Sequence, residues 1–358
     1  MTEGRRLTHG GDWAGYQARY GGQPLDFSAN ISPLGLPEGV RRAAADALAN
    51  AHRYPDPLCR GLVAAIARAE RVEPDWCLCG NGAADLIYRA VLARRPEKAL
   101  ITAPAFAEYE AALELIGCKT DRFPLRAEDE FALGEDFPDA ISPEIDLVFL
   151  CQPNNPTGRT IPRSLLERAL ERCREADALL VVDECFLDFL DEPEAFTMKG
   201  LLGRYPNLLI LKAFTKLYAM AGLRLGYCLC ADAALLGRMR EAGQPWAVSG
   251  PAQAAGMAAL EETAYVEAVR TLIRTERPRL AQALVRLGLR VIPGEANYLL
   301  FHSPVPLEEP LRERGILLRD CSNYHGLGRG WYRTAVRDGA DNGRLIAALQ
   351  DVLKEGTL

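Results

Sequence analysis

"LVFLCQPNNPTGRTIPRSLLERALERCREADALLVVDECF", residues 147–186, contains the pattern that decides the fold. Two short apolar runs, 147–151 and 179–183, flank a segment at 162–176 that has the apolar spacing of a helix. Such runs are typical of strands that are buried on both faces, and a helix between two of them indicates a parallel crossover. Polar residues follow both runs, so we expect a ligand site at the carboxyl ends of these strands.

The same alternation extends in both directions along the chain. Apolar strands alternating with helices predict an α/β fold whose central sheet is mostly parallel and covered by helices on both faces. The further predicted strands are 76–82, 98–104, 207–214 and 224–232, and the further predicted helices are 40–50, 58–70, 83–94 and 106–117.

The pattern changes after about Pro245. A long helical stretch, 266–288, precedes two strand-like segments, 289–303 and 330–338, which alternate with short helices. Residues 1–37 are rich in Gly, Pro and polar residues and contain one strand-like piece. A chain of 358 residues favours two domains. We therefore expect an N-terminal arm that joins the small domain (1–40), a large domain (41–244) and a smaller α+β domain (245–358).

Composition excludes several classes of protein. Hydrophobic residues make up 49% of the chain and charged residues 25%, which is typical of a soluble globular enzyme. The net charge of -6 argues against nucleic-acid binding. No apolar run approaches the roughly 20 residues that span a bilayer, and the N-terminus lacks the apolar core of a signal peptide. We expect a cytoplasmic protein with no nucleic-acid or membrane partner.

The ten cysteines do not form the pattern of a metal site or a disulfide scaffold. Most lie in strand-like apolar runs, and Cys77 and Cys79 are spaced to share one face of a strand rather than to bind zinc. We interpret them as small core residues of a reduced protein that holds no metal.

A candidate catalytic residue, Lys216, lies among apolar neighbours in "LKAFTKLYAMAGLRLGY", residues 211–227. A lysine there can form a Schiff base with an aldehyde, or it can be a snorkelling side chain at a sheet edge. Asp183 ends the strand "LLVVD" and can pair with a protonated pyridine nitrogen, or it can cap the strand. A Schiff-base lysine and such an aspartate together indicate pyridoxal 5'-phosphate.

A phosphate site completes this set. "GNGAAD" opens a predicted helix, and its amides at Gly82, Ala83 and Ala84 suit a phosphate group. The guanidinium of Arg224 can bind the same phosphate through charge-assisted hydrogen bonds. Alone, the glycine pair is an ordinary strand–helix turn. When it is followed along the chain by "NNPTG", Asp183 and Lys216, it is strong evidence for a pyridoxal 5'-phosphate site.

The motifs "GNGAADLI", "APAFAEYE", "CQPNNPTG", "VVDECF" and "FTKLYAMAGLRLGY" resemble the fold-type I pyridoxal-phosphate aminotransferases, in their histidinol-phosphate aminotransferase branch. The resemblance covers nearly the whole chain and implies the aspartate aminotransferase-like fold. "HGGDW", "DFSANISPLGLP" and "ILLRDCSNYHGLGRGWYRTAVR" are similar to one family within that branch, the threonine-phosphate decarboxylases of cobalamin synthesis.

The resemblance assigns roles to individual residues. It implies that Lys216 is the Schiff-base lysine, that Thr215 and Arg224 bind the cofactor phosphate, and that Asn155 bonds the cofactor's 3-oxygen. Tyr109 or Phe106 would stack on the cofactor ring, and we favour Tyr109. Tyr54 would reach the cofactor phosphate of a second subunit, so a homodimer with shared active sites is implied.

Two positions depart from the pattern. Relatives often carry a hydroxyl where this chain has Ala213, which removes one phosphate hydrogen bond worth about 0.5–1.5 kcal/mol. Aminotransferases of the branch usually have tyrosine three residues after the pyridine aspartate, where this chain has Phe186. We interpret Phe186 as support for a decarboxylase.

The substrate implied is a phosphorylated amino acid, which needs two cationic anchors. Arg333 matches the carboxylate-binding arginine, and Arg319 suits the phosphate; the alternative for both is surface ion pairing. Asn155 and Asn30 would also contact the substrate. His9 and Gly10 would close over it, although a histidine so near the terminus is more often part of a disordered tail.

The resemblance implies decarboxylation of L-threonine O-3-phosphate to (R)-1-amino-2-propanol phosphate and carbon dioxide. The alternative is an aminotransferase for histidinol phosphate or an aromatic amino acid. A non-catalytic protein of the same fold is disfavoured, because it has no need of Lys216, Asp183, Asn155 and Arg224 together.

Overall fold

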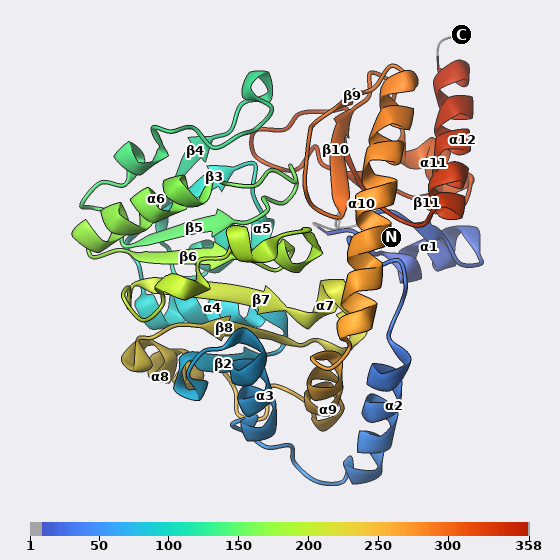
Figure 1. Ribbon diagram of the computed structural model, residues 1–358. Coiled ribbons are helices and arrows are strands. Elements are labelled where there is room, and N and C mark those ends of the chain that lie inside the picture. Colours follow the sequence, from blue (N-terminus) through green and yellow to red (C-terminus); the bar gives the residue numbers. More distant parts are fainter. Residues whose placement is uncertain (1–8, 357–358) are drawn as a thin grey trace.

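A seven-stranded sheet forms the centre of the protein in the computed structural model, which describes residues 9–356 (Figure 1). Its strand order is β2-β8-β7-β6-β5-β3-β4, and β8 alone runs antiparallel to its neighbours. This confirms the predicted α/β fold with a mostly parallel sheet. The strands are β2 (Cys77–Gly80), β3 (Lys98–Ala103), β4 (Lys119–Pro124), β5 (Leu147–Cys151), β6 (Leu179–Asp183), β7 (Leu208–Ala213) and β8 (Gly226–Leu229).

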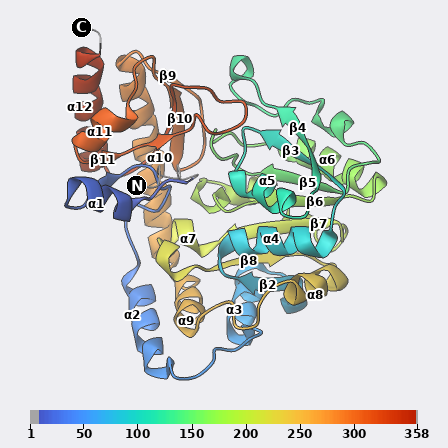
Figure 2. The same ribbon diagram turned by 180° about the vertical axis from the view of Figure 1, so that it is seen from behind.

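Helices cover both faces of this sheet, because its strands alternate their apolar side chains between two cores. Val148 and Leu150 of β5 pack in one core, and Leu147 and Phe149 pack in the other. The two views in Figures 1 and 2 show the two helical layers. The first core includes α3 (Arg60–Glu70), α6 (Arg163–Glu175) and α9 (Gly250–Ala259), and the second includes α4 (Gly82–Arg94), α5 (Ala107–Glu114) and α8 (Ala233–Glu241).

A second, antiparallel sheet lies beside the first in the order β12-β13-β10-β9. The N-terminal strand β1 pairs in parallel with β11, which ties the arm to this C-terminal region. The elements are α1 (Trp13–Tyr20), β1 (Leu25–Asp26), α2 (Glu38–Ala47), α7 (Phe214–Leu217), α10 (Thr263–Arg286), β9 (Arg290–Val291), β10 (Tyr298–His302), α11 (Glu308–Glu313), β11 (Ile316–Leu317), β12 (Arg319–Asp320), β13 (Trp331–Ala335) and α12 (Gly339–Glu355).

The domain boundaries at 40/41 and 244/245 stay a proposal. The β1–β11 pairing joins the arm to the C-terminal region, but the boundary at 40/41 falls within α2. At the second boundary, α9 still packs against α2 and α3 of the large domain. The third hydrophobic core is formed mainly by α10 and the elements after it, together with Phe27, Phe186, Phe189 and Leu217 from earlier in the chain. The helix α10 runs unbroken through Pro278.

Seven elements were not among the predicted ones. Three of them, α7, β11 and β12, are only two to four residues long. The other four were missed for identifiable reasons. β4 carries Lys119, Asp121 and Arg122 at the sheet edge, so it lacks the apolar run of a buried strand. The helices α1, α8 and α9 are short, at eight to ten residues, and α9 is rich in Ala and Gly. Their weak apolar periodicity is insufficient to identify them from one sequence.

All ten cysteines are free thiols; nine are buried, and Cys185 is half-buried. In the part of the chain that the structure describes, no helix has the length and apolarity to cross a membrane. Residues 9–356 also contain no group of three His, Cys, Asp or Glu residues that could hold a metal ion.

Candidate active site

A cavity of about 400 Å³ opens at the carboxyl ends of β5, β6 and β7. Cys151, Asp183 and Ala213 end these strands, and all three line the cavity. The remaining walls come from the start of α4, from the arm and from β12 and β13. This is the position where open α/β sheets bind ligands, because the carboxyl ends of parallel strands meet at one edge.

Lys216 enters the cavity from α7, the short helix that follows β7. Loss of hydration, followed by the positive charges of Arg333 and Arg224, lowers the pKa of Lys216 to about 8. Its Nζ lies 5.7 Å from the centre of the Phe186 ring. A lysine with this pKa is substantially neutral near pH 8, so it can act as a nucleophile toward an aldehyde.

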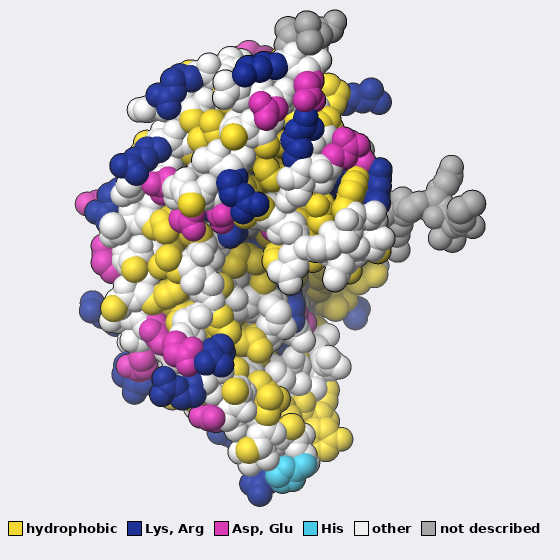
Figure 3. Space-filling view, turned by 90° about the vertical axis from the view of Figure 1, so that its right-hand side faces the viewer, with side chains coloured by type: hydrophobic (Ala, Val, Ile, Leu, Met, Phe, Trp, Pro, Cys, Tyr) yellow, Lys and Arg dark blue, Asp and Glu magenta, His cyan; other side chains and the backbone are white. Residues whose placement is uncertain are grey.

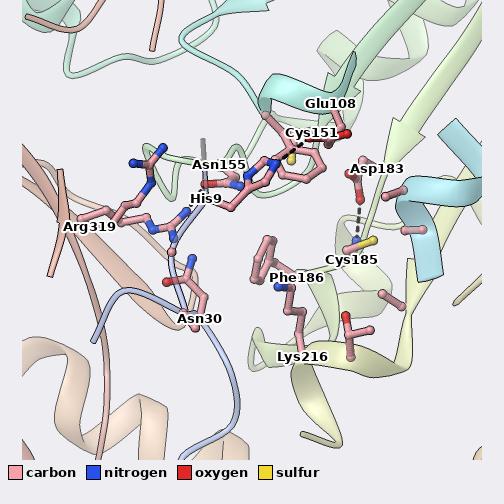
Figure 4. Close-up of a pocket in the computed structure, with 18 of the residues that line it drawn as sticks. His9, Asn30, Glu108, Cys151, Asn155, Asp183, Cys185, Phe186, Lys216 and Arg319 are labelled. Atoms are coloured by element: carbon pink, nitrogen blue, oxygen red, sulfur yellow. Dashed lines mark hydrogen bonds and ion pairs between the residues drawn. The ribbon is translucent and has the colours of Figure 1, made fainter. Parts of the chain in front are cut away.

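Asp183 is buried at the end of β6 and faces the same cavity. Its Oδ2 accepts a hydrogen bond from the Tyr109 hydroxyl at 2.7 Å, and its Oδ1 accepts one from the Cys185 amide at 3.0 Å. Figure 4 shows Asp183 and Lys216 on walls of one cavity. A carboxylate fixed in this way suits a protonated pyridine nitrogen.

The preference for Tyr109 as the residue that stacks on the cofactor is corrected by the structure. Tyr109 is fully buried behind Asp183 and stacks on Phe149, with ring centres 4.7 Å apart, so it does not line the cavity. Phe106, the alternative, does line it. The reason is that α5 begins at Ala107, which turns Tyr109 inward and leaves Phe106 at the edge of the helix.

The start of α4 has the form of a phosphate site. Ala83 and Ala84 line the cavity, as do Thr215 and Arg224. Gly82 lies behind them at a φ of +82°, and a Cβ there would stand 2.7 Å from Nη2 of Arg224. Glycine therefore lets the guanidinium approach the helix N-terminus, and both groups attract an anion. These residues fit the phosphate of pyridoxal 5'-phosphate.

Two arginines and an asparagine form the opposite wall. Arg333 donates from Nη1 to Oδ1 of Asn155 and from Nη2 to the Ser28 carbonyl oxygen at 2.8 Å. Arg319 donates from Nη1 to the Asp320 carbonyl oxygen at 2.6 Å and lies over the Tyr324 ring. Both guanidiniums are buried, which contradicts the alternative of surface ion pairs.

Unsatisfied polar atoms in this wall indicate a missing ligand. Asn30 is 1% exposed, and neither its amide nitrogen nor its amide oxygen has a partner within residues 9–356. Nε of Arg333 is likewise without a partner there. Buried polar groups of native proteins are normally hydrogen-bonded. A bound anion would accept hydrogen bonds from the Asn30 amide nitrogen and from Nε of Arg333, and it would neutralise the buried cations.

The arm closes the cavity. His9 and Gly10 line it, and Nε2 of His9 lies 2.5 Å from Oε1 of Glu108. A Cβ at Gly10 would stand 2.4 Å from the Ser28 carbonyl oxygen, so only glycine packs there. His9 thus belongs to the cavity wall and not to a disordered tail. Residues 1–8 lie outside the described part of the chain.

Tyr54 lies away from this cavity, with 80% of its surface exposed and its ring stacked on Trp246. Its role toward a second subunit stays a prediction. The cavity also contains residues that we did not predict, among them Glu108 and Tyr324. Glu108 lies in the quoted "APAFAEYE" motif and Tyr324 in "SNYHGLG", so nearness to a motif was the available signal.

The pKa of Lys216 gives a testable pH dependence. In the protein freed of cofactor, the neutral amine should increase as pH rises through about 8 and then level off. The rate at which added pyridoxal 5'-phosphate forms its visible absorbance band should follow the same curve. An ordinary lysine would titrate near 10.4, so a rate that still climbs steeply above pH 9 would contradict the prediction.

Comparison with known proteins agrees with this geometry. Residues 23–349 match the family model "Aminotransferase class I and II". The chain is 42% identical to the threonine-phosphate decarboxylase of Salmonella typhimurium over 92% of each protein. It is 36% identical to the histidinol-phosphate aminotransferase of Symbiobacterium thermophilum, covering 93% of this chain and 91% of that protein.

Two crystal structures have the same fold. The histidinol-phosphate aminotransferase of Clostridium acetobutylicum superimposes with a TM-score of 0.87 at 28% identity, covering 92% of this chain and 99% of that one. The L-threonine-O-3-phosphate decarboxylase of Porphyromonas gingivalis gives 0.82 at 26% identity, with the same coverage. The chain therefore belongs to the class I and II aminotransferase family of fold-type I enzymes, and its cofactor is pyridoxal 5'-phosphate.

Proposed function

We propose that this enzyme decarboxylates L-threonine O-3-phosphate to (R)-1-amino-2-propanol phosphate, as a step of cobalamin biosynthesis. The observation that carries the proposal is the pair of buried guanidiniums, Arg319 and Arg333, beside the unpartnered Asn30. This wall is complementary to a small substrate with two anionic groups. The 42% identity to the Salmonella typhimurium decarboxylase supports the same reading.

In this proposal each anchor has one role. Arg333 holds the α-carboxylate, and Arg319 with Asn30 holds the phosphate. Fixing both ends prevents rotation of the substrate about its α-carbon, and that rotation decides whether the carboxylate or the α-hydrogen leaves. Binding energy from the phosphate is thus used to orient the bond that breaks.

The cofactor supplies an electron sink when it is bound. Asp183, held by Tyr109 and the Cys185 amide, keeps a proton on the pyridine nitrogen. The amine of Lys216 carries the proton that is returned to the substrate's α-carbon after carbon dioxide has left. Phe186 brings no hydroxyl to this part of the site.

The second candidate is a histidinol-phosphate aminotransferase, favoured by the fold match to the Clostridium acetobutylicum enzyme. That substrate has a phosphate but no carboxylate, so Arg333 would then serve the keto-acid acceptor instead. We further propose that the enzyme works in the cytoplasm, where its ten thiols stay reduced.

We also propose a homodimer with shared active sites. Tyr54, Leu48, Leu58 and Trp246 are large exposed hydrophobic residues near α2 and the segment that follows it. Figure 3 shows hydrophobic side chains gathered at the lower end of one face, where Figure 1 has α2. Contiguous apolar surface of this kind marks an association site, and Tyr54 would reach the partner's cofactor phosphate from it.

The first prediction tests the reaction. Purified enzyme given L-threonine phosphate alone should release carbon dioxide over many turnovers without a keto acid, because decarboxylation leaves the cofactor unchanged. Product analysis by mass spectrometry should find aminopropanol phosphate. A single turnover that stops until 2-oxoglutarate is added, or activity on histidinol phosphate only, would replace the proposal with the second candidate.

The second prediction tests the anchors. Arg319→Ala and Arg333→Ala should each lower kcat/KM for L-threonine phosphate by about ten- to a hundredfold, as expected when a charge-assisted hydrogen bond worth about 1.5–3 kcal/mol is lost. Arg337→Gln is the matched control, since Arg337 pairs with Asp341 and does not line the cavity. Wild-type kinetics in both alanine variants would move the substrate site elsewhere.

The third prediction tests the shared site. Lys216→Ala and Tyr54→Ala homodimers should each be impaired, the first in chemistry and the second in cofactor retention. Mixed and refolded subunits should recover activity, because a mixed dimer contains one site with both residues intact. No recovery in dimers verified by light scattering, or a monomeric active wild type, would contradict shared sites.

A further inference from the structure

Glu108 is a charged residue of the cavity that the proposed reaction does not use. It lies in the first turn of α5 and keeps 20% of its side chain exposed. Its Oε1 meets Nε2 of His9 at 2.5 Å, and its Oε2 accepts a hydrogen bond from the Tyr88 hydroxyl of α4 at 3.0 Å. Figure 4 shows His9 and Glu108 pointing toward each other across the cavity, joined by a dashed line.

A carboxylate at this place needs an explanation. Glu108 lines the same cavity as Arg319 and Asn30, which would bind the phosphate, and a bare negative charge there would repel that phosphate. The hydrogen bond from His9 holds the pKa of Glu108 below its usual range, against the effect of burial, and the Tyr88 hydroxyl acts in the same direction. Glu108 is therefore an ionised carboxylate whose two oxygens are bound by the His9 ring and the Tyr88 hydroxyl.

The geometry of the pair determines which ring nitrogen of His9 is left to bind a ligand. With Nε2 directed at Glu108, Nδ1 is left, and it has no partner within residues 9–356. The ring also packs against Phe106, with ring centres 5.5 Å apart. A carboxylate that accepts the hydrogen of one imidazole nitrogen fixes the ring. A carboxylate on one side of the ring and a phosphate on the other both favour the protonated imidazole, in which each nitrogen is an N–H donor.

We propose that Glu108, braced by Tyr88, is a positioning residue that holds His9 so that its Nδ1–H binds the phosphate group of the substrate. This inference rests on the proposed function only in its choice of substrate. The arm is thereby closed by a chain of three residues from three elements. Tyr88 orients Glu108, Glu108 orients His9, and His9 contacts the phosphate.

The chain contains a matched control on the same helix. Glu110 contacts His325 at 3.3 Å between Oε2 and Nε2, and it also pairs with Arg122. Neither Glu110 nor His325 lines the cavity. Glu110→Gln thus removes the same kind of carboxylate, two residues along α5, without touching the substrate.

The experiment uses the holoenzyme and two ligands, L-threonine phosphate and L-threonine. Dissociation constants come from the change that each ligand causes in the visible absorbance band, and KM and kcat come from carbon dioxide release. Glu108→Gln should weaken binding of the phosphorylated ligand by about tenfold or more and raise its KM. It should leave kcat within about twofold and L-threonine binding unchanged. Tyr88→Phe should give a smaller effect of the same sign.

A double-mutant cycle of His9 and Glu108 distinguishes a positioning role of Glu108 from a merely structural one. His9→Asn should cost as much as Glu108→Gln, and the double variant should cost no more than His9→Asn alone, because Glu108 acts only through His9. Glu110→Gln should behave as wild type. Equal losses for both ligands, additive losses, or tighter binding of the phosphorylated ligand to Glu108→Gln would overturn the inference.

Failure of the proposed decarboxylase function can be distinguished from failure of the positioning role of Glu108. If the wild type does not decarboxylate L-threonine phosphate, the same comparison is made with histidinol phosphate and histidinol as the pair of ligands. A loss in Glu108→Gln that is confined to the phosphorylated member would still support the positioning role. An equal or absent loss would overturn it independently of the reaction.

Discussion

A buried carboxylate at the end of β6 is the constraint around which the site is arranged. Burying an ionised carboxylate is costly unless it is hydrogen-bonded. Asp183 meets this condition through the Tyr109 hydroxyl and the Cys185 amide. Tyr109 can reach it only because α5 packs on that face of the sheet, and β6 lies between β5 and β7. The order of strands and the packing of one helix thus fix the charge to which the cofactor binds.

Positive charge balances this arrangement on the other walls. Arg224 approaches the N-terminus of α4 past Gly82, and Arg319 and Arg333 are buried in the opposite wall. Loss of hydration, followed by the charges of Arg333 and Arg224, keeps the pKa of Lys216 low enough for a neutral amine near pH 8. The cations that would bind two anionic ligands therefore also prepare the nucleophile, so binding and chemistry share one electrostatic field.

Much of this was predictable from the sequence because it depends on short-range patterns. Apolar runs such as 147–151 identify buried strands, and carboxyl ends of parallel strands must meet, which brings Asp183 and Lys216 together. The choice between Phe106 and Tyr109 was not predictable, since one residue of shift in the start of α5 reverses it. The contact between His9 and Glu108 joins residues 99 positions apart and depends on how the arm packs, which no local pattern records.

Arg333 has a consequence for how such an enzyme can diverge. It binds Asn155 of the large domain's loop and the Ser28 backbone of the arm, from a strand of the C-terminal sheet. A change at this position that accommodated a substrate without a carboxylate would also remove these two contacts, although the β1–β11 pairing would still hold the arm. Evolution of a new substrate at the carboxylate end of the cavity would therefore have to compensate for lost packing contacts as well as for lost binding.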